Sequence, residues 1–291
     1  HDVKYNGKGK QVMKLGVDTL PDLPKDTTDR NRTSPFAFTG NKFEFRMLGS
    51  TFSIAGPNII LNTIVADELR QFADELEGAA DFNAALHDLV VKTIKEHKRI
   101  IFNGNNYTDE WTKEAKKRGL LNLRNSAEAL PHFADKKNIE LFERNEVFTE
   151  REVTSRMSIM LENYSKVLTI EALTMIEMGR KDIYPAVNEY ISELCAAVYR
   201  KEQYGAPVAA DKEVIAKLSA ANEAMYGKIG EIEKLLIDAK AYEDPVKCAK
   251  FFADKIIPVM QEMRAYADEM EMNTAKKYWP FPTYGDILFS V

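Results

Sequence analysis

Cysteine is scarce in this sequence, because only Cys195 and Cys248 occur among 291 residues. Two cysteines are too few for a disulfide framework. Each lies in a helical pattern beside alanine and apolar residues. Buried structural thiols in a reducing cytoplasm are therefore favoured over a disulfide or a reactive site, and we expect a cytoplasmic protein.

A long apolar run is also missing. The longest uncharged apolar stretches, such as Ile54 to Ala66, are well short of a bilayer span and contain Pro57, Asn58 and Asn62. The first residues show no apolar core followed by a small-residue cleavage site. These absences predict that the chain has no transmembrane helix, no signal peptide and no membrane partner.

No basic block occurs either. The 40 lysine and arginine residues are interspersed with 45 acidic residues, for a formal charge of −5. Binding to a phosphate backbone needs a concentrated positive face, so we do not expect nucleic acid as a partner. The sequence does contain 45% hydrophobic residues, which over this length can fill one large domain or two ordinary ones.

The sequence pattern changes once along the chain, from strand-and-loop composition to helical spacing. The first fifty or so residues carry Pro21, Pro24 and Pro35, several glycines and short alternating segments, which are typical of strands and loops. Beyond Gly56 the apolar spacing becomes helical. It predicts helices over 58–77, 81–101, a short stretch after Thr108, 126–134, 136–144, 149–201, 210–242 and 245–273. We expect a mainly α, α+β fold, in which a short strand-and-loop region precedes a bundle of long helices and an extended aromatic tail.

Local signals refine these helices. Thr149 followed by Glu152 has the spacing of a capping box and predicts a helix start. Pro185 and Pro258 lie inside helical patterns. Proline lacks a backbone N–H and collides with the preceding turn, so we expect a kink or break near Tyr184 and a bend at Pro258.

Residues 42–46 hold the most informative pattern. Lys42, Glu44 and Arg46 alternate with two phenylalanines, so an extended chain places the three charged groups on one face. A carboxylate is a hard ligand for magnesium, and a guanidinium can clamp a carboxylate or phosphate. A metal–nucleotide site is one interpretation. A solvated amphipathic strand is the other, and the spacing alone favours it.

Other candidate residues are weaker. His87, His97 and His132 lack metal-ligand spacing to one another or to cysteine, so ordinary polar histidines are favoured. Eight methionines follow helical spacing, which favours core filling over an adaptable partner surface. They are Met157, Met160, Met175, Met178, Met260, Met263, Met270 and Met272.

The segments NRTSPFAFTGNKFEFRMLGS and SIAGPNIILNTIVA resemble the part of glutamine synthetases in which an Asn-Arg-Ser/Thr motif precedes a strand with a Glu-x-Arg motif and then a helix. FNGNNYTDEW, IEALTMIEM and YWPFPTYGDILFSV resemble the long, type III branch. The resemblance runs through essentially the whole chain. It implies that residues 1–78 complete the catalytic sheet at the end of the catalytic domain, that 79–275 form a helical extension and that 276–291 form the tail.

The resemblance also implies roles for four residues. Glu44 would bind the Mg²⁺ or Mn²⁺ ion that bridges to the ATP phosphates, and Arg46 would contact glutamate near its reacting γ-carboxylate. Arg32 would hold the transferring γ-phosphoryl group. The familiar branches have a second arginine that this chain lacks, and Lys42 is the residue expected to supply its charge. The family's reaction is the ATP-dependent amidation of glutamate by ammonia through γ-glutamyl phosphate.

The family further implies a large homo-oligomer with active sites between subunits. Most of its metal-binding carboxylates, and its metal-binding histidine, would lie before His1, so the chain alone is expected to be inactive. A hypothesis of a different class is a non-catalytic helical assembly or regulatory module. An inert truncated paralogue is a third.

Overall fold

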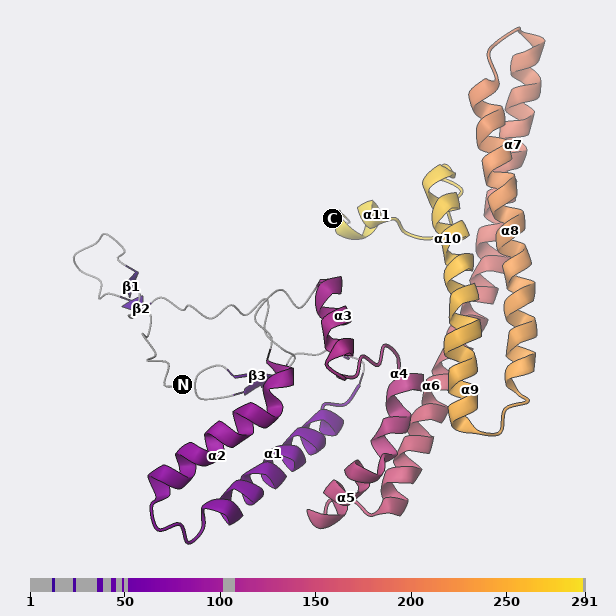
Figure 1. The fold of residues 1–291 in the computed structure, drawn as a ribbon. Helices are drawn as coiled ribbons and strands as arrows, with labels where there is room; N and C mark the ends of the chain where they lie inside the picture. Colours follow the sequence, from indigo (N-terminus) through magenta and orange to yellow (C-terminus); the bar gives the residue numbers. More distant parts are fainter. Residues whose placement is uncertain are drawn as a thin grey trace. The chain divides into compact units, whose positions relative to one another are not determined.

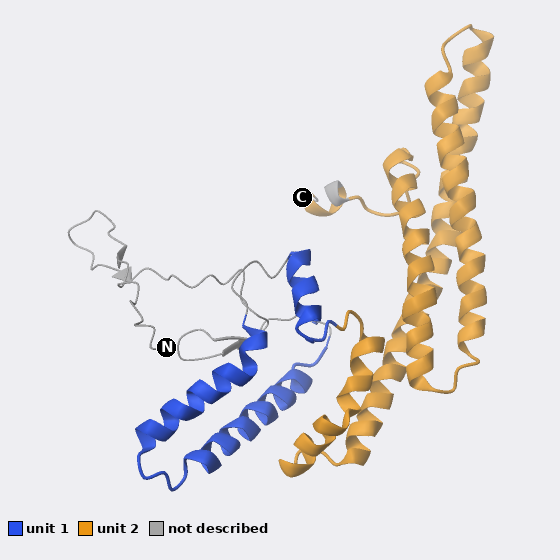
Figure 2. Cartoon of the chain, viewed as in Figure 1, with its two compact units in different colours: residues 1–122 blue, residues 123–291 orange. Residues whose placement is uncertain are grey.

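The computed structural model describes four short strands, Gly49, residues 52–101 and residues 108–289. The chain divides into two compact units, His1–Asn122 and Leu123–Val291, which are coloured separately in Figure 2. The domain limits expected at residues 78 and 275 stay a prediction.

The strands of unit 1 form two separate antiparallel pairs. β1 (Val12–Met13) pairs with β2 (Leu23–Pro24), and β3 (Phe36–Phe38) pairs with β4 (Phe43–Phe45). No further strand joins these pairs into a larger sheet within the described part of the chain. The expectation of an α+β fold whose strand region completes a catalytic sheet is therefore wrong. Two-stranded ribbons of two or three residues bury too little to act as a sheet, and Pro24 in β2 cannot donate a ladder hydrogen bond.

Helices make up the rest of unit 1. They are α1 (Ala55–Leu76), α2 (Phe82–His97), the 3₁₀ turn η1 (Lys98–Ile100) and α3 (Asp109–Lys117). A short turn joins α1 to α2 (Figure 1), with Gly78 at φ 79° and the Asp81 side chain accepting from the backbone N–H groups of Asn83 and Ala84. The left-handed φ explains the glycine, and the cap explains why α2 begins at Phe82.

Unit 2 is a bundle of long helices. Its elements are α4 (Ser126–Ala129), η2 (Leu130–Ala134), α5 (Lys136–Arg144), α6 (Glu150–Met178), η3 (Gly179–Ile183), α7 (Tyr184–Gln203), α8 (Ala209–Ala239), α9 (Pro245–Phe251), η4 (Phe252–Ile256), α10 (Ile257–Asn273) and α11 (Tyr284–Leu288). In Figure 1, α8 returns alongside α7, and α10 lies along α8. The helices expected from the apolar spacing are confirmed here, and the Thr149–Glu152 capping box starts α6 as predicted.

Both internal prolines are accommodated by a widened turn. η3 and η4 are π-helices of five residues, and each ends two residues before its proline, Pro185 or Pro258. A proline cannot donate to the carbonyl four residues earlier, and a π turn relieves the collision of its ring with that carbonyl. The helical path therefore continues through each proline. A kink or a break was expected near Tyr184, and the helix does not break there.

The core of unit 2 lies where α8 meets the two proline-containing helical paths. Leu218, Met225, Ile229 and Ile232 of α8 are fully buried. The same core cluster contains buried residues of the two proline-containing helical paths, namely Ile176, Ile183, Phe252, Ile256 and Met263. The prediction of core methionines is confirmed for Met260, Met263 and Met270, whereas Met160, Met178 and Met272 are exposed.

The C-terminal tail contains the short helix α11, although an extended segment was expected. Thr283 and Asp286 explain the difference, because their T-x-x-D spacing is that of a cap. The Asp286 carboxylate accepts from the Thr283 N–H at 3.0 Å and from its hydroxyl at 2.8 Å. No helix among the described residues is long and apolar enough to cross a membrane.

Candidate functional site

The four residues singled out from the sequence are outside the part whose side chains are described. Arg32, Lys42 and Arg46 lie beyond the described residues. Glu44 is placed by its backbone alone, in β4 opposite Ala37 of β3. Their grouping into one site therefore stays a prediction.

The described residues contain no cluster of three or more histidine, cysteine, aspartate or glutamate side chains that could hold a metal ion. His132 makes a local contact, with its Nδ1 2.9 Å from the Asp135 carboxylate.

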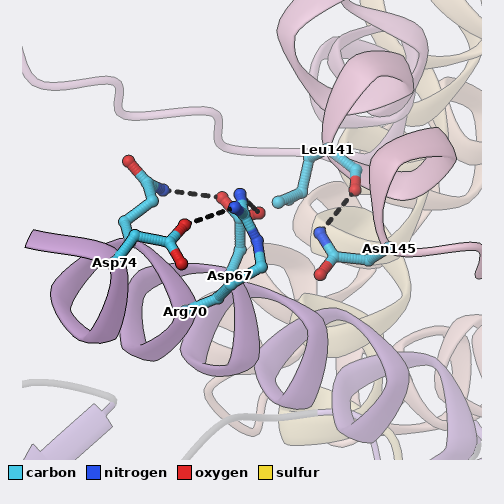
Figure 3. A network of polar contacts seen from close by, with 6 residues as sticks. Asp67, Arg70, Asp74, Leu141 and Asn145 are labelled. Atoms are coloured by element: carbon cyan, nitrogen blue, oxygen red, sulfur yellow. Dashed lines mark hydrogen bonds and ion pairs between the residues drawn. The ribbon is translucent and has the colours of Figure 1, made fainter. Parts of the chain in front are cut away.

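A buried carboxylate occurs on α1 of unit 1. Asp67 is 2% exposed, and its two oxygens accept from Arg70 at 3.3 Å and from Gln71 at 2.8 Å (Figure 3). Arg70 also donates to Asp74 at 3.0 Å. A buried carboxylate needs such partners, and Arg70 and Gln71 supply them. The i+3 and i+4 spacing was visible in the sequence, but the burial of Asp67 was not.

Polar contacts also tie unit 2 together. Asn145 at the end of α5 donates to the Leu141 carbonyl at 2.8 Å, as Figure 3 also shows. Lys228 of α8 lies 2.8 Å from Glu231 and 2.6 Å from Glu262 of α10. Hydrogen bonds to these two carboxylates raise the pKa of Lys228 above its usual range. Only the Lys228–Glu262 pair links two helices, α8 and α10, whereas the other contacts are local to one helix.

One hollow in unit 2 is an apolar groove of about 870 Å³. Helices α6 and α10, the π-helix η3 and the tail line it. Met175, Met178, Met260 and Met263 supply flexible walls, which can adapt to an apolar partner. Arg264 pairs with Asp268 at 2.5 Å along the same lining. The groove offers binding surface and lacks an activated nucleophile among its described lining residues.

A second hollow, of about 290 Å³, is polar and lies between α7 and α8. Tyr184 and Asn188 come from α7, and Ser219, Asn222, Glu223 and Tyr226 from α8. We call it the Asn222 pocket. No pattern in the sequence indicated it, because its two sides are more than 30 residues apart.

Comparison with known proteins decides the family. A model of the glutamine synthetase C-terminal domain matches residues 85–202. The chain is 36% identical over 294 residues to the type-3 glutamine synthetase of Dictyostelium discoideum. It is 38% identical over 304 residues to a glutamine synthetase of Butyrivibrio fibrisolvens and 30% over 297 residues to one of Bacteroides fragilis.

The chain belongs with the type III glutamine synthetases. These alignments cover 97 to 99% of the chain and only 40 to 41% of the relatives, so the chain spans well under half of their length. The resemblance of this sequence to the C-terminal portion of a type III glutamine synthetase is confirmed. The matched residues 85–202 run from α2 to α7 and include part of both hollows.

Proposed function

We propose that this chain is the C-terminal part of an enzyme that joins ammonia to glutamate at the expense of ATP, through γ-glutamyl phosphate. The observation that carries the proposal is the similarity, along nearly the whole chain, to proteins that are themselves named glutamine synthetases. The proposal extends the activity in those names to the complete protein that contains this sequence.

The residue roles follow from the chemistry of the reaction. Glutamate and ATP are both anions, and negative charge accumulates where the γ-carboxylate attacks the γ-phosphoryl group. Arg32 and Lys42 would neutralise the phosphoryl group, and Arg46 would orient the γ-carboxylate of glutamate. Glu44 would be one ligand of Mg²⁺ or Mn²⁺, and the bound ion would offset the charge of the phosphates.

The chain by itself would not catalyse glutamine formation. One carboxylate rarely holds magnesium in a productive geometry, so the remaining ligands must come from the part of the complete protein that this chain does not span. The complete enzyme would act in the cytoplasm as a large homo-oligomer.

Substitution in the complete enzyme tests the site. Glu44→Ala should lower glutamine formation by about 100-fold or more, because a metal ligand near the transferring phosphoryl group is lost. The matched control is Glu68→Ala, since Glu68 is an exposed glutamate of α1 and should leave turnover unchanged. Turnover is measured as glutamine formed from glutamate, ammonium and ATP. Full activity of the Glu44→Ala enzyme would refute the assignment.

A specific observation supports the second candidate, a helical assembly module. Helix α6 leaves several large apolar side chains on its surface, at 43 to 64% exposure. They are Ile159, Val167, Ile170 and Leu173, and we call them the α6 stripe. Such a stripe is typical of a face that another protein surface covers. We assign it to contacts between copies of the protein within the proposed homo-oligomer.

A further inference from the structure

The apolar groove of unit 2 has one wall from α6 and one from α10. The α6 wall consists of Leu168, Glu171, Met175 and Met178, which recur every three or four residues. The α10 wall repeats this spacing over residues 257–271. Side chains at such spacing share one face of a helix, so each wall runs along its helix. At 1.5 Å per residue, the α10 wall is about 20 Å long.

A third helix fits between two such walls. A helix is about 10–12 Å wide, and its side chains pack into the groove that two neighbouring helices leave between them. The α10 wall is long enough to contact about three to four turns of a bound helix. The methionine side chains can adapt to its apolar face, and Trp279 and Phe281 of the tail add aromatic contacts. The shape of the groove therefore suits an amphipathic helix.

The charges along the groove are mostly negative. Its described lining contains three carboxylates, Glu171, Asp268 and Glu271, and one guanidinium, that of Arg264. Arg264 pairs with Asp268, so these two charges offset each other. Glu171 on the α6 wall and Glu271 on the α10 wall have no ion-pair partner within the part of the chain that the structure describes. The groove therefore favours a helix with positive charges beside its apolar face.

We propose that the apolar groove binds a basic amphipathic helix of a separate partner protein. The apolar face of this helix would contact the methionines, and its lysine or arginine side chains would pair with Glu171 and Glu271. The same carboxylates would repel an acidic helix, and an apolar small molecule would leave both charges unpaired. The α6 stripe consists of other residues, so binding in the groove does not depend on the assembly or the catalytic function proposed above.

Fluorescence anisotropy on the complete protein that contains this chain tests the proposal. The probe is a fluorescein-labelled peptide of about 14 leucine and lysine residues, arranged so that the leucines form one face of a helix. It should bind along a saturable curve with a dissociation constant of about 10 μM. A peptide with glutamate in place of every lysine should bind at least about tenfold more weakly, because the two free carboxylates repel it. The same leucine and lysine residues in an order without an apolar face should also bind at least about tenfold more weakly.

Paired charge reversals locate the binding site. Glu171→Lys combined with Glu271→Lys should raise the dissociation constant of the basic peptide about tenfold or more, because both attractive charges become repulsive. The matched control is Glu189→Lys combined with Glu213→Lys, at exposed glutamates of α7 and α8 outside the groove lining. This control changes the net charge equally and should leave the constant within about twofold of the parent value.

Two partly exposed methionines test the apolar contact without disturbing the core. Met178 lines the groove and is 36% exposed, whereas Met272 of α10 is 79% exposed and lies outside the lining. Met178→Gln should weaken peptide binding about fivefold, and Met272→Gln should leave it unchanged.

Four outcomes would overturn the proposal. They are the absence of saturable binding, equal binding of the acidic peptide, equal binding of the peptide without an apolar face, and equal effects of the groove variants and their controls. A fall in the mass measured by light scattering when the basic peptide is added would show that a second copy occupies the groove. That result would replace the separate partner with a contact between copies.

Discussion

Gly179 shows how a single missing side chain allows helices to approach each other. It is the first residue of η3 and has an ordinary helical φ of −61°, so backbone freedom does not explain it. A Cβ at this position would lie 2.5 Å from Met263 Cε and 3.1 Å from Ile229 Cδ1. Met263 Cε is the end of a flexible side chain that also lines the apolar groove, whereas Ile229 is fully buried and has less room to shift. The absence of a side chain at Gly179 thus lets η3 pack closely against α8 and α10.

Paired glycine substitutions test this contact. A Cβ added at Gly227 of α8 would meet nothing within 4 Å, so Gly227→Ala should stabilise the chain by about 0.5–1 kcal/mol through helix propensity alone. Gly179→Ala has the same intrinsic gain but overpacks the core. We expect it to be roughly 1–3 kcal/mol less stable than Gly227→Ala in urea unfolding. Equal stability of the two variants would contradict the packing argument.

At the scale of elements, one carboxylate caps the short helix α11. Asp286 of α11 pairs with Lys276 and accepts two hydrogen bonds from Thr283. The ion pair with Lys276, followed by the bonds from Thr283, lowers the pKa of Asp286 from 3.8 to about 2. A carboxyl group whose pKa is lower in the folded state stabilises that state above its ordinary pKa. This stabilisation is lost as the pH falls through the lowered value.

The cap of α11 should therefore be intact at neutral pH and loosen between pH 3.8 and about 2. The backbone amide signals of Thr283 and Asp286, which take part in the cap, should move over this pH range in a nuclear magnetic resonance titration. Asp286→Asn should abolish this titration step. If the variant gave the same titration curve as the parent, Asp286 would not be the group that titrates.

At the scale of the whole molecule, the two units differ in what they bury. Unit 2 has an extensive apolar core, whereas α1 and α2 leave Leu69, Phe82 and Ile94 more than half exposed. A helical hairpin needs a surface to cover its apolar side chains. The relatives that this chain matches are more than twice as long as the chain.

The α6 stripe gives the test of assembly. In the complete protein, Ile170→Glu combined with Leu173→Glu should reduce the mass measured by light scattering, because two charges would be buried at the proposed contact between copies. Ile237→Glu is the matched control, since Ile237 is 66% exposed on α8, outside the stripe. An unchanged mass of the double variant would exclude the stripe from the assembly.

Capping and apolar spacing were sufficient to predict much of the helical structure. The capping box at Thr149 marks the start of α6, and the helices over 136–144 and 245–273 appear where the spacing places them. The family was likewise recognisable from motifs in the sequence. These signals are local, because a cap or a helical turn is completed within about four residues.

Tertiary structure decided the features that join distant residues. The alternation at 42–46 suggested a sheet, but a sheet needs partner strands, and the described part of the chain contains only two-stranded pairs. The π turns before Pro185 and Pro258 replace a break with a continuous helix. The Asn222 pocket is lined by α7 and α8, and the hydrogen bond from Asn222 to the Tyr184 carbonyl joins residues 38 positions apart. Side-chain burial and pairing across such separations depend on how whole helices pack, which periodicity along one helix does not encode.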